Sequence, residues 1–136
     1  MLWFVITGKT KIQKKIYEME QKLIELGDII AESLNHISMV KVDSYPQFLH
    51  VEMFAKDNAF YRELKIQPSK PNSKNIFYVS YPVYECDVLL CEIDIRNKSK
   101  EEIQEIFITA FHKQMNAWIE EESTLLKAMK SFIRKK

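Results

Sequence analysis

The longest regular pattern in the chain is a row of apolar side chains at helical spacing in its N-terminal third. Its members follow one another at intervals of three or four residues: Ile12, Ile16, Met19, Leu23, Leu26, Ile30, Leu34 and Ile37. Such spacing places them on one face of a helix, which we expect over residues 10–36. Gly27 and Asp28 interrupt the pattern with residue types that end and begin helices. The segment is therefore either one helix with a weak point or two helices that meet at Gly27.

A second helical pattern occupies the C-terminal end, and we expect this helix over residues 99–131. The segment Ser99-Lys-Glu-Glu102 matches a capping box, in which the Ser and Glu side chains each accept a hydrogen bond from the other residue's backbone N–H. The apolar stripe that follows consists of Ile103, Phe107, Phe111, Met115, Trp118, Leu125, Met129 and Phe132. Glu122 falls on this stripe, so the helix either bends or restarts near Ser123.

Between the two helices the period changes to two residues, which indicates β-strands. The expected strands are Met39–Asp43, Gln47–Ala55, Phe60–Ile66, Ile76–Tyr81 and Val83–Ile95. Most of their connections are too short for parallel crossovers, so we expect antiparallel pairing. In the last strand the alternation slips between Leu90 and Cys91. This slip indicates either a β-bulge or a central strand that is covered on both faces.

The first residues, Leu2–Thr7, are rich in β-branched and aromatic side chains and stop at Gly8. They are typical of a short buried strand that pairs with a strand distant in the sequence. The element order becomes β-α-β-β-β-β-β-α. We therefore predict one α+β domain over residues 1–136, with a curved, mainly antiparallel sheet of five to six strands. The long N- and C-terminal helices should pack on one face of this sheet.

Charge changes this picture through its distribution rather than its total. The formal net charge of the 136 residues is only +1, but residues 1–15 and 127–136 hold nine of the 20 bases and no acid. The body between them carries eleven bases against 19 acids, or −8. Two cysteines in one expected strand, Cys86 and Cys91, should point to opposite faces and stay unpaired. Free thiols and the lack of a long apolar run predict a cytoplasmic protein with no membrane span.

The sequence contains few combinations of residues that suggest catalysis. Asp57, Glu63 and Lys65 loosely resemble the arrangement of a Mg²⁺-dependent nuclease, in which two carboxylates hold the ion and a lysine orients the attacking water. The three histidines are far apart and none has a second ligand at zinc-binding spacing. We therefore expect no enzyme activity, no metal and no cofactor, with the nuclease as the least unlikely enzymatic function.

Acidic and aromatic side chains gather on the later strands, where they suggest a docking surface. The residues we select for partner binding are Tyr81, Tyr84, Glu85, Asp87, Glu92 and Asp94. Aromatic anchors supply buried area at interfaces, and acids supply steering and register. Phe48, Phe54, Tyr61 and Tyr78 also fall off the apparent core face, so the second sheet face is either a binding surface or merely amphipathic.

These patterns favour a non-enzymatic intracellular protein that binds a basic partner protein, in the manner of an immunity protein, an antitoxin or a chaperone. A first alternative is nucleic-acid binding by the basic ends, through Lys9, Lys11, Lys14, Lys15, Lys130, Arg134, Lys135 and Lys136. A second alternative is a small-molecule carrier with a cavity between sheet and helices. A homodimer formed through one of the helix stripes is also compatible with the sequence.

Overall fold

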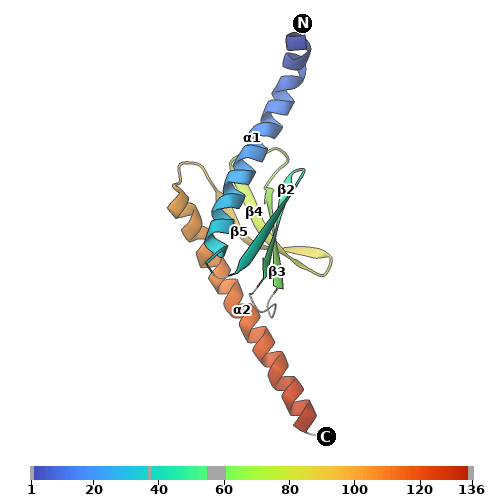
Figure 1. Ribbon diagram of the computed structural model, residues 1–136, viewed down its shortest axis with the longest axis vertical. Helices are drawn as coiled ribbons and strands as arrows, with labels where there is room; N and C mark the ends of the chain where they lie inside the picture. Colours follow the sequence, from blue (N-terminus) through green and yellow to red (C-terminus); the bar gives the residue numbers. More distant parts are fainter. Residues whose placement is uncertain (1, 37, 55–60, 135–136) are drawn as a thin grey trace.

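The computed structural model describes residues 2–36, 38–54 and 61–134. Two long helices flank a five-stranded antiparallel sheet (Figure 1). The elements are α1 (Leu2–Leu34), β1 (Met39–Tyr45), β2 (Phe48–Phe54), β3 (Tyr61–Pro68), β4 (Ile76–Val83), β5 (Cys86–Asp94) and α2 (Lys100–Arg134). The predicted α+β class, the antiparallel sheet and the two terminal helices are confirmed.

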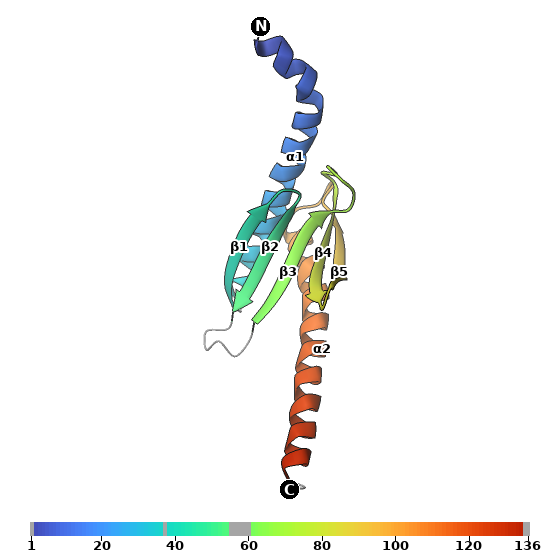
Figure 2. The same ribbon diagram turned by 90° about the vertical axis from the view of Figure 1, so that its right-hand side faces the viewer.

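The strand predicted at Leu2–Thr7 is wrong, because these residues form the first turns of α1. This part of α1 runs away from the sheet, so none of the five described strands lies beside it (Figure 2). An unpaired strand leaves its backbone N–H and C=O groups without protein partners, whereas a helix satisfies them within the segment. Continuity with the helix that follows therefore outweighs the local preference of these β-branched and aromatic residues for a strand.

The sheet is a simple meander in which each strand pairs with its neighbour in the sequence, in the order β1-β2-β3-β4-β5. The first hairpin turns tightly at Pro46 and Gln47, with a φ of 69° at Gln47. Along β4 and β5, Val79 pairs with Cys91 but Ser80 pairs with Leu89, which leaves Leu90 as an extra residue. This confirms the β-bulge expected from the slip in the alternation.

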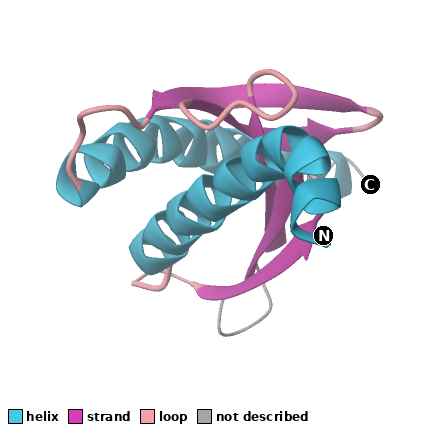
Figure 3. Ribbon diagram, turned by 90° about the horizontal axis from the view of Figure 1, so that it is seen from above, coloured by secondary structure: helices cyan, strands magenta, loops and turns pink. Residues whose placement is uncertain are grey.

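Both helices pack against the same face of the sheet, which curves around them (Figure 3). The helix α1 contributes Met19, Leu23, Leu26, Ile30 and Leu34 to the core, and α2 contributes Ile103, Phe107, Phe111 and Trp118. These are the predicted stripes, truncated where each helix leaves the sheet. The predicted capping box is also present, with the Ser99 Oγ accepting from the Glu102 N–H at 3.2 Å and Glu102 Oε1 accepting from the Ser99 N–H at 3.3 Å.

Gly27 does not break α1, which continues through it as one helix. A Cβ atom added to Gly27 would lie 2.3 Å from Cδ1 of Leu49 in β2. The glycine therefore permits a close approach of helix and sheet, and it does not act as a helix end.

The strand predicted over Val83–Ile95 is wrong in its first residues. Tyr84 and Glu85 form the turn between β4 and β5, and Tyr84 has a φ of 57°. No glycine, asparagine or aspartate stands at these two positions, so the usual residue types of a two-residue hairpin are missing. The turn is imposed by the pairing of the strands on either side of it.

The bulge also changes where the two cysteines point. Cys86 pairs with Val83 and Cys91 with Val79, so the register places both on the helix-facing side instead of on opposite faces. Cys86 is exposed, Cys91 is partly buried, and both are free thiols.

Candidate functional site

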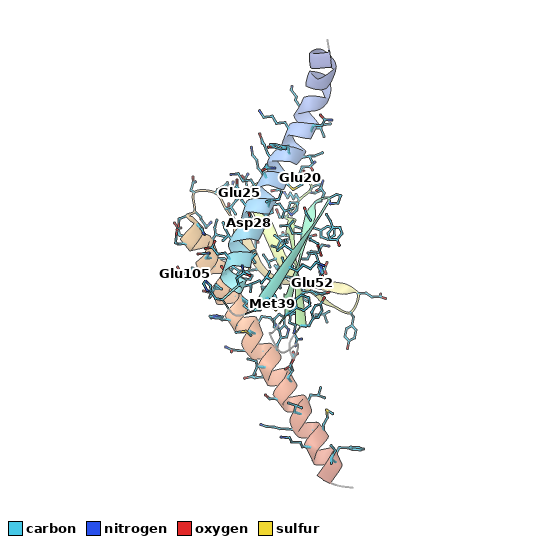
Figure 4. The ribbon with its side chains drawn as sticks, viewed as in Figure 1. Glu20, Glu25, Asp28, Met39, Glu52 and Glu105 are labelled. Carbon is cyan, nitrogen blue, oxygen red and sulfur yellow. The ribbon has the colours of Figure 1, made fainter. Side chains whose placement is uncertain are left out.

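The candidate site is the sheet face that neither helix covers, which we call the outer face. On β2 its members Phe48, His50, Glu52 and Phe54 alternate with the buried residues Leu49, Val51 and Met53. Strand pairing extends the same face across the sheet. In Figure 4, Glu52 lies on the side of the sheet away from α1, whereas Asp28 lies on the outward side of that helix. The outer face is therefore a continuous surface built from all five strands.

Aromatic rings occupy much of the outer face. Tyr45 stacks on Phe48 with ring centroids 4.9 Å apart and an interplanar angle of 11°. Phe54 lies 5.2 Å from Tyr61 in a tilted arrangement. Tyr78 is half-buried in β4 on the same face. The expectation that Phe48, Phe54, Tyr61 and Tyr78 lie off the core face is confirmed.

A histidine stands at the centre of the outer face, surrounded by carboxylates. His50 Nδ1 lies 3.5 Å from Glu52 Oε1, and His50 Nε2 lies 3.6 Å from Glu63 Oε1. Asp43 is the cross-strand partner of His50. The Tyr61 hydroxyl donates a hydrogen bond to Glu63, and this bond, together with partial burial and the charges of Glu63 and Glu52, raises the pKa of Tyr61 to about 12.

The ligand atoms of Asp43, His50 and Glu52 all lie within 4.8 Å of one another. Imidazole and carboxylate are metal ligands, so these three residues are the group among the described residues that could hold a divalent cation. All three are partly exposed, and His50 also faces the carboxylate of Glu63. The arrangement therefore serves equally well as a polar centre that accepts hydrogen bonds or a cationic side chain.

The residues of the nuclease hypothesis are only partly placed. Asp57 lies outside the described residues. Glu63 and Lys65 lie on the outer face of β3, two residues apart. Glu63 contacts His50 and Tyr61, while Lys65 Nζ lies 3.4 Å from Asp87 Oδ2 and 4.9 Å from the centre of the Phe48 ring. The contacts of both residues are thus with side chains of the outer face.

The six residues predicted for partner binding fall into three groups. Asp87, Glu92 and Asp94 lie on the outer face, because the bulge restores the alternation between them. Tyr84 and Glu85 form the exposed hairpin tip. Tyr81 points to the helix side, where its hydroxyl lies 3.1 Å from Gln114 Oε1 and its ring meets Trp118 edge-on.

The outer face has a negative charge. Its carboxylates are Asp43, Glu52, Glu63, Asp87, Glu92 and Asp94, against the two lysines Lys41 and Lys65. Arg96 lies at one end of this face and binds Asp94 through both carboxylate oxygens, at 3.0 and 2.7 Å. These hydrogen bonds, with one from the Arg96 backbone N–H, hold the pKa of Asp94 well below its usual range.

Sequence reasoning did not select Asp43, His50, Glu52 or Tyr45 as site residues. The information was present in the first hairpin, since a turn at Pro46 and Gln47 sets Tyr45 opposite Phe48 and Asp43 opposite His50. Register in a hairpin follows from the turn length. Placing Glu63 beside this group requires the second register as well, which depends on the segment 55–60.

The basic ends of the sequence lie at opposite ends of the molecule, where α1 and α2 project (Figures 1 and 2). At the first end, a groove of about 710 Å³ is lined by Lys11, Lys14 and Lys15 of α1 and by Lys70 and Lys74 of the β3–β4 loop. Lys74 also bonds Glu18 at 2.8 Å, which lowers the pKa of that carboxyl. At the other end Lys130 is exposed on α2, while Lys135 and Lys136 lie outside the described residues. The two basic ends therefore do not form one surface.

The remaining alternatives have less support. The space between helices and sheet is filled by apolar side chains such as Phe77, Phe107 and Phe111, none of them exposed. The carrier alternative therefore has no supporting observation in the described part of the chain.

No helix in the described part of the chain has both the length and the apolar character needed to cross a membrane. Comparison with protein-family models, curated proteins and solved structures found no match, so the inference of function rests on the geometry above.

Proposed function

We propose that this chain is a non-enzymatic protein-binding domain whose outer face docks onto a partner with a basic surface. The observation that carries the proposal is the composition of this face. It presents aromatic rings between six carboxylates, and neither α1 nor α2 covers it. A sheet face that served only to meet water would require alternating polar residues and not five rings.

The two kinds of side chain have separate roles in this proposal. Tyr and Phe rings bring large apolar areas at a small cost in side-chain entropy, which suits them as anchors of an interface. The carboxylates around them attract a basic partner and fix its orientation. Stacking of Tyr45 on Phe48 holds both rings in place before the partner arrives, so less freedom is lost on binding.

The hairpin tip extends this surface. Tyr84 is fully exposed and its backbone is in the left-handed region, which is unfavourable for a tyrosine. A strained, solvent-exposed aromatic side chain contributes nothing to the core, so a contact with a partner supplies a reason for it. Asp87 of the outer face is three residues from Tyr84, which makes the tip continuous with the face. An immunity protein, an antitoxin or a chaperone would use such a surface in this way.

Matched variants test the proposal. A partner is isolated with the wild-type chain, and its affinity is then measured for Tyr45→Ala and for Tyr17→Ala. Both tyrosines are exposed, but Tyr17 lies on α1 away from the outer face. The Tyr45 change should cost about 2 kcal/mol of binding as an interface anchor, whereas the Tyr17 change should be neutral.

A second pair of variants tests the contribution of the carboxylates to partner binding. Glu92→Lys on the outer face should slow association and reduce its dependence on salt. Glu105→Lys, on the exposed side of α2, should do neither (Figure 4). Equal affinities of the partner for wild type, Tyr45→Ala and Glu92→Lys would rule out docking at the outer face.

Nucleic-acid binding remains a second candidate because of the lysine groove at the first end of the molecule. Five lysines from α1 and the β3–β4 loop converge there, opposed by one carboxylate. Lysines contact phosphates with a strong dependence on salt. Lys14→Ala or Lys70→Ala should weaken binding of an oligonucleotide. Each change should also reduce the slope of the logarithm of the binding constant against the logarithm of the salt concentration by about 1, as expected for the loss of one phosphate contact. Lys113→Ala, exposed on α2, is the matched control.

A further inference from the structure

The C-terminal half of α2 carries an apolar stripe into solvent. Trp118 is the last residue of α2 in the core, and every described side chain from Ile119 to Ile133 is exposed. The exposed fractions are 53% for Ile119, 56% for Leu126, 53% for Met129 and 67% for Ile133. Their spacing places them on one side of the helix. We define this segment, Ile119–Ile133, as the α2 tail.

A helix in this situation needs a partner. The α2 tail projects from the body at one end of the molecule (Figures 1 and 2), so no other element of the described chain packs along it. Helices of this length are only marginally stable in water on their own, and most helical stability comes from packing an apolar face. A contiguous exposed apolar stripe of this kind marks an interaction surface.

The charges on the α2 tail indicate what this partner is. Glu120 and Glu121 lie at its start, near the body, while Lys127 and Lys130 lie towards its free end. Two copies aligned antiparallel about Leu126 would set Ile119 of one tail level with Ile133 of the other. In this register Glu120 and Glu121 of one copy lie within about 3 Å, along the axis, of Lys130 of the other, at 1.5 Å per residue. A parallel pair would set acids beside acids and lysines beside lysines, which is unfavourable. The antiparallel arrangement also opposes the two helix dipoles.

We propose that the α2 tail pairs with the same segment of a second copy, antiparallel, through Ile119, Leu126, Met129 and Ile133. The symmetry is two-fold, so each copy offers the same stripe and receives the same stripe. Arg62 of β3 bonds Glu122 at 2.9 Å and fixes the start of the tail on its own body. The stripe lies on the part of α2 beyond the core and includes no residue of the outer face.

The first test is the mass of the full chain in solution, measured by sedimentation over a range of concentrations. Wild type should be a dimer. Leu126→Glu, which places a charge on the stripe, should raise the dissociation constant at least a hundredfold. Thr124→Glu makes the same addition of charge on the other side of the helix and should leave the dimer intact. Far-UV circular dichroism of each variant separates loss of pairing from loss of folding.

The orientation is tested by a zero-length carbodiimide cross-link in a mixture of isotopically light and heavy chains. Links between Glu120 or Glu121 of one copy and Lys130 of the other are expected. In a parallel pair these residues would lie at least about 13 Å apart along the axis, at 1.5 Å per residue, beyond the reach of such a link. A monomeric wild type, a dimer unaffected by Leu126→Glu, or a dimer that forms no such link would each overturn the proposal. A dimer broken by Tyr17→Glu alone would place the interface on α1 and would also overturn it.

Discussion

The contact between Gly27 and Leu49 allows a substitution whose two effects have opposite signs. Replacing glycine by alanine inside a helix normally raises the free energy of unfolding by about 1 kcal/mol. In this fold the new Cβ would lie 2.3 Å from Leu49 Cδ1, whereas carbon atoms in contact normally lie at about 3.5–4.0 Å. Leu49 is buried, so the overlap must be relieved by movement within a packed core.

The magnitudes decide the expected result. Overpacking of this kind costs about 1–3 kcal/mol, which exceeds the gain from helix propensity. Gly27→Ala should therefore lower the free energy of unfolding by about 1 kcal/mol as the net of these two effects. Leu49→Val removes the Cδ1 atom at a cost of about 1 kcal/mol. In the Leu49→Val background the same Gly27→Ala change should become stabilising by about 1 kcal/mol, because only the propensity gain remains.

The assay is urea denaturation followed by far-UV circular dichroism for the four members of the cycle. Asp28, the exposed neighbour of Gly27, provides the calibration, because the difference between Asp28→Ala and Asp28→Gly measures local helix propensity without any core contact. If Gly27→Ala stabilises the wild type as much as it stabilises the Leu49→Val variant, the close approach of α1 to β2 does not have the energetic role described above.

Three further predictions concern the turn, the thiols and the cap. Tyr84→Gly should raise the free energy of unfolding by up to about 1 kcal/mol in thermal melts, because it relieves a left-handed φ without loss of packing; a loss of stability would contradict this. Exposed Cys86 should react at once with a thiol reagent, whereas burial raises the pKa of Cys91 to about 11 and should make it react slowly. Cys91 keeps its proton to higher pH in the folded protein than in the unfolded chain, so its contribution to the free energy of unfolding should fall as the pH rises from about 9 to 11. The Cys91→Ala variant should therefore show a smaller fall in the free energy of unfolding over this pH range. Ser99→Ala should cost about 1 kcal/mol in urea denaturation through loss of the cap, and an unchanged midpoint would show that α2 begins without it.

Most of the secondary structure could be predicted because it depends on local periodicity. The stripes of α1 and α2, the alternation along β2 and the slip at Leu90 are all properties of consecutive residues. The segment Leu2–Thr7 could not be predicted in this way, since its conformation depends on whether a strand lies near it. The turn at Tyr84 and Glu85 was missed for a related reason, because pairing on both sides imposes it against the local preference.

The candidate site, like the secondary structure, could be predicted only where it depends on consecutive residues. Alternation alone placed Phe48, Phe54 and Tyr61 away from the core. The contacts that define the centre of the outer face, such as those of His50 with Glu52 and Glu63, join residues from different strands. They follow only when the registers of two hairpins are combined. The nearness of Tyr81 to acids in the sequence predicts that it lies on the docking surface, but its contacts with Gln114 and Trp118 lie on the helix side.

The meander order of the sheet bears on how the chain reaches this structure. Every strand pairs with the strand next to it in the sequence, so each hairpin can close over a short loop and the sheet can grow one strand at a time. The helices α1 and α2, at the two ends of the sequence, meet each other as well as the sheet. Their contact closes a loop that contains the whole sheet, which favours its formation after the strands are paired. Synthesis from the N-terminus completes α1 and the five strands before α2 exists, so the growing chain exposes the part of its apolar sheet face that α2 covers, at β5, until α2 emerges.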